Sequence, residues 1–407
     1  MPARIGGEHF VLLSQRGDER IPVGVAVTRR TVNQHDGRRM RSGVPMHLII
    51  NICVIDGYVW HIAYLNTTRY NRPMQTTLDE FTKTVDSRIS LFDVKIDSET
   101  NGTLTFSGRV LDKSQLDELP RLFPSLKLDT ASIRVLNAET HERIHVATNL
   151  TGLYEKPTFG MPLSSELVYG TELEVLDEKE KWVFTKQKDG YLGWAYRPYL
   201  GEGLAPAATH LVLAPAIELR AEPDSNSGVV TRIVSGTGVV VETTRDNWSR
   251  VTANKSGWVE SIHLRAMDNL PKTLSAKREL MAVDSARMTG VPYLWGGTSG
   301  NGIDCSGFAQ LLHRWVGKDI PRDADMQCNA AKPVEPPYEV GDLFFFGEGD
   351  SKSDITHVGM SLGGWKMIHS SRGRNGVYVD DLQERKSLMD IFVSAGSFLR
   401  QEWIKRA

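Results

Sequence analysis

The order of apolar and polar residues divides the chain into a strand-rich first part, two similar middle segments and a mixed last part. Near the start, short apolar and β-branched runs separated by Gly, Asn and Asp predict strands. These runs are HFVLL, IPVGVAVT, MHLIINICVI and YVWHIAYL. The period then changes. Leu78, Phe81 and Val85 form a helical stripe, and FDVKID-SETNG-TLTFSGRVL predicts a hairpin that turns at Asn101-Gly102.

A short helix and one more strand complete this first part. The residues from Ser114 predict a helix that ends at Pro120, and Ala131 to Leu136 predict a strand. The elements after the first strands thus follow the order α-β-β-α-β. We expect an α+β domain over residues 1–140, to which the sequence assigns no role.

The middle of the chain contains two diverged copies of one unit, over residues 144–203 and 206–267. Each copy has an L-x-x-x-P element, a Gly-Thr turn before a strand rich in Val and Glu, a tryptophan, and a Gly-Trp pair near the final strand. Five short strands with alternating polarity predict a small barrel, because closure hides the sheet edges. The copies resemble bacterial SH3-like domains. They act either as rigid spacers or as part of a substrate site.

Residues 272–407 carry the strongest chemical signal. Asp304 suits a helix N-cap, which places Cys305 in the first turn of a helix. There the helix dipole and free N–H groups favour a thiolate. Cys53, inside an apolar run, and Cys328 fit structural cysteines instead. The apolar residues after Cys305 recur with the spacing of a buried helix face: Phe308, Leu311, Leu312 and Trp315.

Two histidines are candidate bases for this thiol. His357 lies in the strand-like run ITHVGMSL and His369 in KMIHSS, with Gly363-Gly364 between them. A two-residue loop would send the histidines to opposite faces, whereas a three-residue loop ending at Trp365 would place both on one face. If His369 orients His357, the loop therefore contains an odd number of residues or a bulge.

These motifs resemble the NlpC/P60 family of cell-wall cysteine peptidases, which have a papain-like fold. The likeness covers about residues 275–400, through YLWGG, DCSGF, PRDADMQ, GDLFFF, THVGM and IHSS. It implies that Cys305 is the nucleophile, His357 the base and His369 the polar third member that holds the imidazole. The fold expected for residues 272–407 is therefore an α+β papain-like catalytic domain.

Tyr293 of YLWGG matches the family position whose hydroxyl joins the Cys305 backbone N–H in an oxyanion hole. Core packing is the alternative for Tyr293 and for Trp295, which is also a candidate substrate contact. The hairpin turn departs from the G-N-G common in this family, because Trp365 takes the third place. A strained turn conformation would then fall on Gly364.

Tandem barrels before such a domain resemble the γ-D-glutamyl-L-diamino acid endopeptidases, which act on muropeptides with a free N-terminal L-Ala. A free ammonium requires carboxylates. Asp323 of PRDADMQ, Glu155 of LYEKP and Tyr191 of DGYLGW match the family positions for this pocket. A solvated charge is the alternative for Glu155, and barrel packing for Tyr191. Asp304 and Ser306 flank the nucleophile as further substrate contacts, although Asp304 is equally explained as the helix cap.

Composition then narrows the classes of function. With 48 Lys and Arg against 50 Asp and Glu, the net charge of −2 gives no footprint for nucleic acid or an anionic membrane. No apolar run approaches the roughly 18 residues of a membrane helix. The start lacks the pattern of a secretory signal, and three cysteines form no paired framework. We expect a cytoplasmic protein without metal or cofactor, or an envelope protein if a signal was removed.

Together these features predict a cysteine endopeptidase that hydrolyses the γ-D-glutamyl–diamino acid amide of murein peptides through a thioester. One alternative is an N-acetylmuramoyl-L-alanine amidase or acyltransferase on the same fold. Another is a non-catalytic peptidoglycan-binding protein. A barrel that closes one end of the cleft with buried negative charge predicts a preference for a free L-Ala amine over intact peptidoglycan. The accepted diamino acid and the oligomeric state stay open.

Overall fold

The structure, a computed structural model, falls into two compact units. It describes residues 11–13, 49–55, 58–64, 71–348 and 354–400. Unit 1 consists of Met1–Val85, Phe92–Val110 and Ser114–Arg134, and unit 2 of Asp86–Leu91, Leu111–Lys113 and Val135–Ala407. The predicted strand IPVGVAVT lies outside the described residues. Residues 86–91, 111–113 and 135–140 of the predicted first domain thus belong to unit 2.

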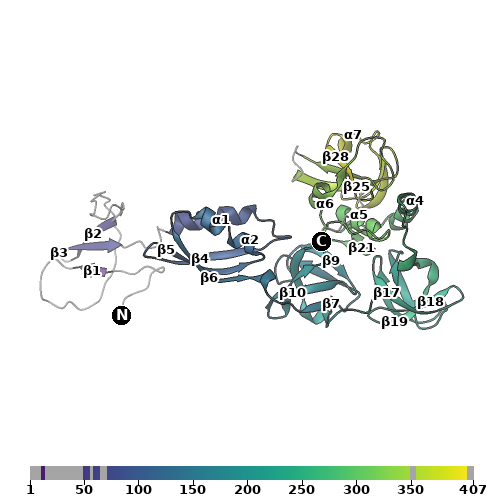
Figure 1. The fold of residues 1–407 in the computed structure, drawn as a ribbon, viewed down its shortest axis with the longest axis horizontal. Helices are drawn as coiled ribbons and strands as arrows, with labels where there is room; N and C mark the ends of the chain where they lie inside the picture. The colour runs from purple at the N-terminus through teal and green to yellow at the C-terminus, as the bar shows by residue number, and fades with distance from the viewer. Residues whose placement is uncertain (1–10, 14–48, 56–57, 65–70, 349–353, 401–407) are drawn as a thin grey trace. The chain divides into compact units, whose positions relative to one another are not determined.

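Unit 1 contains two three-stranded sheets, ordered β1-β3-β2 and β4-β5-β6 (Figure 1). Helix α1 packs on the second sheet, where the Phe81 and Phe92 rings meet edge to face with 4.8 Å between centroids. Leu78 and Phe106 are fully buried. The elements are β1 (Val11–Leu13), β2 (Ile49–Ile55), β3 (Tyr58–Tyr64), α1 (Asn71–Thr84), β4 (Phe92–Thr100), β5 (Thr103–Val110), α2 (Lys113–Leu116), α3 (Leu119–Leu122) and β6 (Lys127–Val135).

The predicted α-β-β-α-β order is present in unit 1, with one correction. The β4–β5 hairpin turns at Asn101 and Gly102, whose φ angles of 51° and 74° are left-handed. Pro120, however, does not end the predicted helix. It lies in the first turn of α3, where a missing N–H costs no intrahelical bond. The predicted helix is therefore two short helices.

Two barrels with one topology begin the main part of unit 2. The first sheet runs β13-β7-β10-β11-β12-β8-β9, and the second repeats this order with β20-β14-β17-β18-β19-β15-β16. Each barrel has seven strands instead of the predicted five, because a first and a last short strand are added and pair with each other. These end strands have only three or four residues, too few for a clear alternation.

The strands of the first barrel are β7 (Arg143–Val146), β8 (Leu150–Tyr154), β9 (Leu163–Val168), β10 (Glu172–Lys179), β11 (Trp182–Gln187), β12 (Leu192–Tyr196) and β13 (Leu200–Glu202). Those of the second barrel are β14 (His210–Val212), β15 (Ala216–Arg220), β16 (Val229–Val234), β17 (Gly238–Arg245), β18 (Trp248–Thr252), β19 (Ser256–Glu260) and β20 (Leu264–Ala266).

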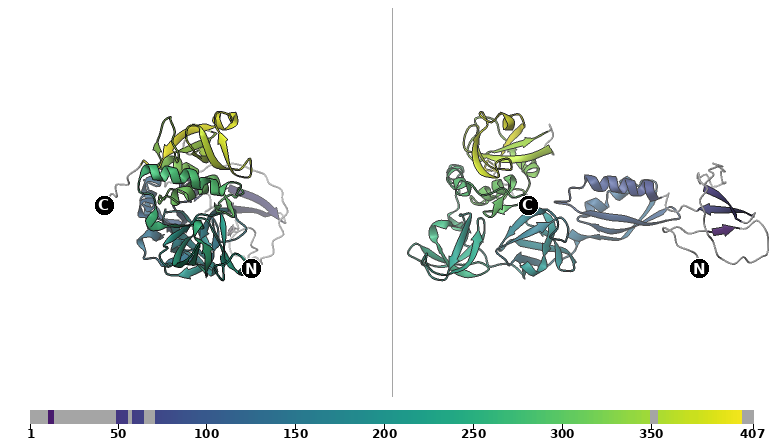
Figure 2. Two further views of the ribbon diagram at one scale, coloured as in Figure 1. Left: turned by 90° about the vertical axis from the view of Figure 1, so that its right-hand side faces the viewer. Right: turned by 180° about the vertical axis from the view of Figure 1, so that it is seen from behind.

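The last part of unit 2 packs helices against a six-stranded sheet of order β23-β28-β24-β25-β26-β27. Helices α4 and α5 lie between the barrels and this sheet (Figures 1 and 2). The elements are α4 (Leu274–Ser285), β21 (Thr298–Ser299), β22 (Gly302–Ile303), α5 (Cys305–Arg314), α6 (Ala324–Ala330), β23 (Lys332–Pro333), β24 (Leu343–Gly347), β25 (Ile355–Ser361), β26 (Lys366–Ser371), β27 (Gly376–Asp381), α7 (Lys386–Met389) and β28 (Phe392–Ser397).

Both barrels make direct contacts with this α+β part. Gly296 has a φ of 77°, and its carbonyl accepts a 2.8 Å hydrogen bond from Glu166 N–H of the first barrel. A side chain at Gly296 would collide with the Leu163 backbone, so this approach requires glycine. From the second barrel, the Val212 carbonyl accepts a 3.1 Å bond from Trp315 Nε1.

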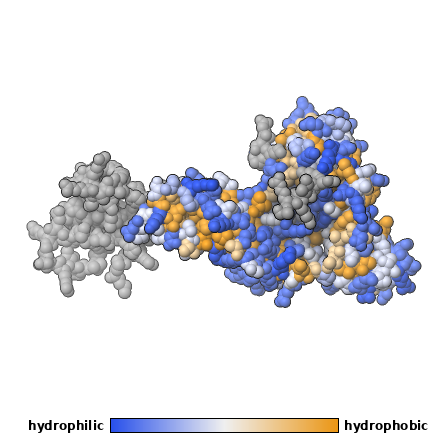
Figure 3. Space-filling model, viewed as in Figure 1, coloured by the Kyte–Doolittle hydropathy of each residue, from blue (hydrophilic) through white to orange (hydrophobic). Residues whose placement is uncertain are grey.

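The face of the molecule shown in Figure 3 is mostly hydrophilic over the barrels, with smaller hydrophobic patches between. None of the helices among the described residues combines the length and the apolar character that crossing a membrane would require.

Candidate active site

Cys305 is the first residue of α5, and it is buried. The helix begins there because Asp304 is its N-cap, with Asp304 Oδ1 accepting a 2.7 Å hydrogen bond from Gly307 N–H. The predicted apolar face is also present: Phe308, Leu311, Leu312 and Trp315 are all buried. The local sequence therefore places the thiol at a helix N-terminus.

The two histidines lie on one face of the β25–β26 hairpin. Ser361 pairs with Met367, and Leu362 N–H donates to the Lys366 carbonyl, so the loop has three residues and ends at Trp365. His357 Nε2 and His369 Nδ1 are 2.7 Å apart. The prediction of an odd loop is confirmed. The positive φ angles, 105° and 59°, fall on the two loop glycines, Gly363 and Gly364.

A third group extends this chain of side chains. Asp380 of β27 has Oδ2 3.0 Å from His369 Nε2, and its other oxygen accepts from Arg374 and Arg385. An ionised carboxylate accepts only, so His369 Nε2 carries a proton. In a neutral ring Nδ1 of His369 is then an acceptor, and it accepts a hydrogen bond from the Nε2–H of His357. This leaves Nδ1 as the free acceptor of His357.

Asp380 was missed in the sequence, although a signal existed. β26 and β27 pair with His369 opposite Tyr378, so Asp380 is the diagonal neighbour of His369 on the same face. The parity argument that joined the histidines would have found it.

The electrostatics of Cys305 differ from the sequence expectation. Burial, and after it the Asp304 carboxylate, raise the pKa of the thiol to about 12, although hydrogen bonds to the backbone of Val358 and Ser306 oppose the shift. Burial likewise lowers the pKa of His357, and His369 adds to the effect. At Cys305 burial thus opposes the thiolate that the helix dipole favours. The two pKa shifts favour a neutral thiol and a neutral imidazole in the resting site.

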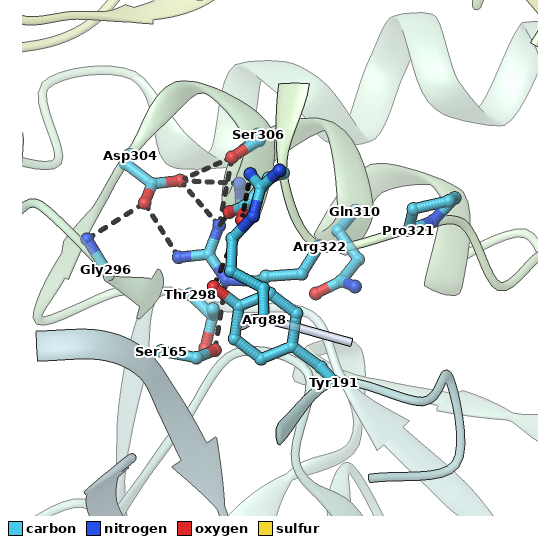
Figure 4. Close-up of polar contacts among 12 residues, drawn as sticks. Arg88, Ser165, Tyr191, Gly296, Thr298, Asp304, Ser306, Gln310, Pro321 and Arg322 are labelled. Carbon is cyan, nitrogen blue, oxygen red and sulfur yellow. Dashed lines mark hydrogen bonds and ion pairs between the residues drawn. The ribbon is translucent and has the colours of Figure 1, made fainter. Parts of the chain in front are cut away.

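A buried arginine organises the residues below the nucleophile (Figure 4). Arg322 donates to both oxygens of Asp304, at 3.1 and 2.7 Å, and to Ser306 Oγ at 2.9 Å. Ser306 in turn donates to Asp304 Oδ1. Gly296 N–H donates to Asp304 Oδ2, at 2.9 Å. Asp304 and Ser306, predicted to touch substrate, thus have their partners within the protein, and they hold the start of α5.

The first barrel supplies side chains at this same end of α5. Ser165 Oγ of β9 accepts a 3.0 Å bond from Arg322 Nε, and Tyr191 Oη donates to Asp323 Oδ2 at 3.0 Å. Glu166 Oε2 accepts from Thr298 N–H at 2.9 Å. Burial raises the pKa of Tyr191, and Asp323 raises it further, so Tyr191 keeps its proton. Tyr191 and Asp323 are brought together as predicted.

Glu155 forms neither a hydrogen bond nor an ion pair with Tyr191 or Asp323. It lies exposed on the bend after β8, and its carboxylate has neither a hydrogen bond nor an ion pair within the described part of the chain. Asp323, in contrast, does not lack a cation: Arg88 Nη1 lies 2.9 Å from its Oδ2. The expectation of unpaired negative charge beside Glu155 is therefore wrong, because the chain itself supplies a guanidinium.

Tyr293 and Trp295 lie on the loop before β21. Trp295 is 62% exposed, which excludes the core-packing alternative for it. Tyr293 is half-buried. Burial raises its pKa, and Cys305 and Asp304 raise it further, so its hydroxyl keeps a proton to donate near the thiol. Cys328, 3% exposed, is a core residue.

No cluster of three or more His, Cys, Asp or Glu side chains suited to a metal ion occurs among the residues that the structure describes.

A cysteine at a helix start, next to a histidine chain on the adjoining sheet, is the arrangement of papain-like cysteine hydrolases. Residues 290–393 match the NlpC/P60 family, residues 215–264 the bacterial SH3 domain and residues 153–195 the bacterial dipeptidyl-peptidase SH3 domain. The chain therefore carries an NlpC/P60 domain behind two bacterial SH3 domains.

Curated relatives extend the similarity over the barrels. A γ-D-glutamyl-L-lysine dipeptidyl-peptidase of Bacillus subtilis is 45% identical over 96 residues, which are 23% of this chain and 32% of that protein. A Bacillus cereus protein of the same name is 27% identical over 53% of this chain and 70% of its own length. Dipeptidyl-peptidase 6 of Lysinibacillus sphaericus is 26% identical over 60% and 93%. The chain thus spans about a third of the Bacillus subtilis relative and more of the other two.

The fold is also that of a solved structure. An NlpC/P60 family protein from Bacillus cereus has a TM-score of 0.55 and 22% identity, over 63% of this chain and 99% of that one.

Proposed function

We propose that the chain is a cysteine endopeptidase that hydrolyses the amide between γ-D-glutamate and a diamino acid in murein peptides. The observation that carries this proposal is the placement of Cys305 at the start of α5 together with the His357–His369–Asp380 chain. The names of the relatives support the bond that is cleaved. They also favour L-Lys as the diamino acid.

The neutral resting pair defines the first step. Sγ of Cys305 attacks the γ-carbonyl carbon while its proton passes to Nδ1 of His357, the acceptor that the hydrogen-bond chain leaves free. The Cys305 N–H and the Tyr293 hydroxyl stabilise the oxyanion, and the high pKa of Tyr293 keeps its proton in place. His357 then protonates the leaving amine, and a thioester remains.

Water completes the turnover. His357 takes a proton from water, the resulting hydroxide attacks the thioester, and the Cys305 thiol is released. Asp380 stays ionised in this scheme, because bonds from His369 and Arg385 outweigh burial and lower its pKa. Its charge favours the imidazolium that forms at His357, the ring beyond His369.

The amine end of the substrate is assigned to Asp323 and Tyr191, which we call the amine pocket. A carboxylate with a neighbouring hydroxyl suits the ammonium of a free N-terminal L-Ala. Glu155, whose exposed carboxylate has no partner in the described part of the chain, stays a predicted contact for the same ammonium. An N-acylated end would bring no charge to Asp323.

The test is mass spectrometry of products from L-Ala-γ-D-Glu-L-Lys, its diaminopimelate analogue, and the same peptide on intact sugar. Release of L-Ala-γ-D-Glu is the expected result. Cleavage between the sugar and L-Ala would instead establish the amidase alternative. Binding of sacculi with no product from any substrate would establish the non-catalytic alternative.

A further inference from the structure

Residues 86–91, which we call the strap, belong to the same compact unit as the barrels and the NlpC/P60 domain. Its backbone is held on the first barrel, where Leu192 N–H donates a 2.7 Å bond to the Arg88 carbonyl. Leu91 packs against the apolar cluster that contains Trp182 and Trp194. These anchors involve neither the guanidinium nor the side-chain stem of Arg88, so that side chain can change rotamer while the strap stays in place.

The Arg88 guanidinium reaches from the strap to the NlpC/P60 domain (Figure 4). Nη1 and Nη2 form a two-pronged pair with Asp325, at 2.8 and 2.6 Å. Nε and Nη2 form a second pair with Asp86, at 2.9 and 2.8 Å. Nη1 also bonds Asp323 Oδ2, at 2.9 Å, and this oxygen accepts the Tyr191 hydroxyl as well. A cation of the chain therefore occupies the carboxylate assigned to the substrate ammonium.

We propose that Arg88 is a specificity-determining residue, an intramolecular competitor of the substrate ammonium at Asp323. This inference rests on the proposed function, because that function assigns the ammonium to Asp323. To admit the ammonium, the Arg88 side chain changes rotamer and gives up its bond to Asp323, so that Oδ2 of Asp323 is free to accept from the substrate. Four carboxylates, those of Asp86, Asp304, Asp323 and Asp325, surround the guanidinium groups of Arg88 and Arg322, whose Nη1 lies 3.8 Å from Asp323 Oδ1. The cluster therefore keeps an excess of negative charge for the substrate ammonium.

The competitor also has a consequence for the end of the reaction. The product L-Ala-γ-D-Glu keeps its ammonium, and Arg88 returning to Asp323 assists its release. Removal of the Arg88 side chain should thus increase the affinity of the amine pocket for a free amine. An N-acylated end gains nothing from the removal, because it brings no cation to the exposed carboxylate. Arg88 therefore reduces the selectivity of the pocket for free amines.

The experiment measures binding of L-Ala-γ-D-Glu and its N-acetyl form by calorimetry. The proteins are Cys305→Ala and Cys305→Ala with Arg88→Gln or Arg88→Ala. Loss of the guanidinium should increase the affinity for the free dipeptide about tenfold, the size expected for one charge-assisted contact. The affinity for the acetylated form should stay unchanged or fall. Equal or weaker binding of the free dipeptide, or no binding to any of the proteins, would overturn the inference.

A matched control is Arg265→Gln in the same Cys305→Ala background. Arg265 of the second barrel also bridges to the NlpC/P60 domain, through Asp284 at 2.6 Å and the Trp315 carbonyl at 3.0 Å, but it does not touch the amine pocket. Its loss should leave dipeptide affinity unchanged. A gain equal to that of Arg88→Gln would mean that looser barrel docking, not competition, explains the result, and would overturn the inference.

A second measurement leaves Arg88 intact. The Nε–H signal of Arg88 in a nitrogen-15 spectrum of Cys305→Ala should shift when the free dipeptide is added and stay in place with the acetylated form. A signal indifferent to both would count against competition. Failure of the proposed function would be distinguishable. If the wild-type protein left L-Ala-γ-D-Glu-L-Lys uncut while Arg88→Gln still bound the dipeptide more tightly, the proposed activity would be wrong and the competition by Arg88 would stand.

Discussion

The two SH3 barrels share one strand order, yet they meet opposite ends of the nucleophile helix α5. The first barrel meets its start, where Ser165 binds Arg322 and Tyr191 binds Asp323. The second meets its end, where the Val212 carbonyl accepts from Trp315 Nε1. The N–H groups without a partner inside the helix, and the nucleophile Cys305, lie only at the N-terminal end of α5. The same fold thus becomes a wall of the site in one place and a support in the other.

The length of one hairpin separates the two barrels further. Trp182 pairs with Tyr196 in the first barrel, and Trp248 pairs with Glu260 in the second, so the first hairpin is two residues longer. The two added residues lie in the turn between Gln187 and Tyr191, where Asp189 Oδ1 accepts the Tyr191 N–H at 3.1 Å. A small extension of a turn therefore suffices to carry a barrel side chain to the NlpC/P60 domain.

If the barrels contribute binding and support but no chemistry, a single change in the NlpC/P60 domain should remove all turnover. We expect Cys305→Ala to lower kcat by about 10⁴-fold or more, because no other group in the scheme attacks the carbonyl. Ala is tolerated at a helix start, so the thermal unfolding midpoint should change little. Residual turnover close to wild type in product analysis would place the nucleophile elsewhere.

The contrast between the barrels should appear when each loses its arginine link. Arg322→Met leaves the buried Asp304 carboxylate without its cation, which should cost about 3–5 kcal/mol of unfolding free energy and most of the activity. Arg265→Met should cost less, about 1–2 kcal/mol, because Arg287 still pairs with Asp284, and kcat should hold. Urea unfolding and steady-state kinetics measure both. Equal losses of kcat would erase the distinction.

Burial of the thiol in the core of the NlpC/P60 domain predicts how the reactivity of Cys305 depends on pH. Because its pKa is raised to about 12, the reactive thiolate is scarce at pH 7 and grows about tenfold per pH unit. Alkylation of Cys305 by iodoacetamide, followed by peptide mapping, should therefore accelerate about 100-fold between pH 7 and 9. Cys305→Ala identifies the labelled peptide. A rate that levels off below pH 7 would mean that the thiolate is already formed.

The sheet side of the site should respond differently from either barrel. Asp380→Asn keeps the shape but removes the fixed acceptor for His369 Nε2, so kcat should fall about tenfold with little change in KM. His369→Ala should have the same signature with a larger loss. The acid limb of the kcat profile should also move, since the charge that favours the imidazolium is gone. An unchanged pH profile would reduce Asp380 to a structural residue.

The smallest effect is expected from the hairpin that distinguishes the barrels. Tyr191→Phe removes one hydrogen bond to Asp323, about 1 kcal/mol, and should raise KM for free-amine peptides about fivefold while kcat holds. Its counterpart in the second barrel, Lys255, is exposed, and Lys255→Met should change neither constant. Equal effects of the two substitutions would remove the functional difference between the barrels.

Local sequence determined the elements whose rules act over a few residues. Asp304 before an apolar helical stripe fixed the place of Cys305, and strand parity tied the relative faces of His357 and His369 to the length of the loop between them. The repeat of a barrel pattern likewise predicted two similar domains, because each unit buries its own core. These inferences needed no knowledge of distant contacts.

Tertiary structure alone decided what surrounds those elements. Arg88 and Asp323 are 235 positions apart, and no pattern along the chain predicts that the Arg88 guanidinium binds the Asp323 carboxylate. The pKa of Cys305 illustrates the same difference. The helix dipole is a local effect visible in the sequence, but the burial that opposes it depends on every segment packed around the thiol. Short-range order was therefore readable from the residues, whereas charge pairing and solvation required the folded chain.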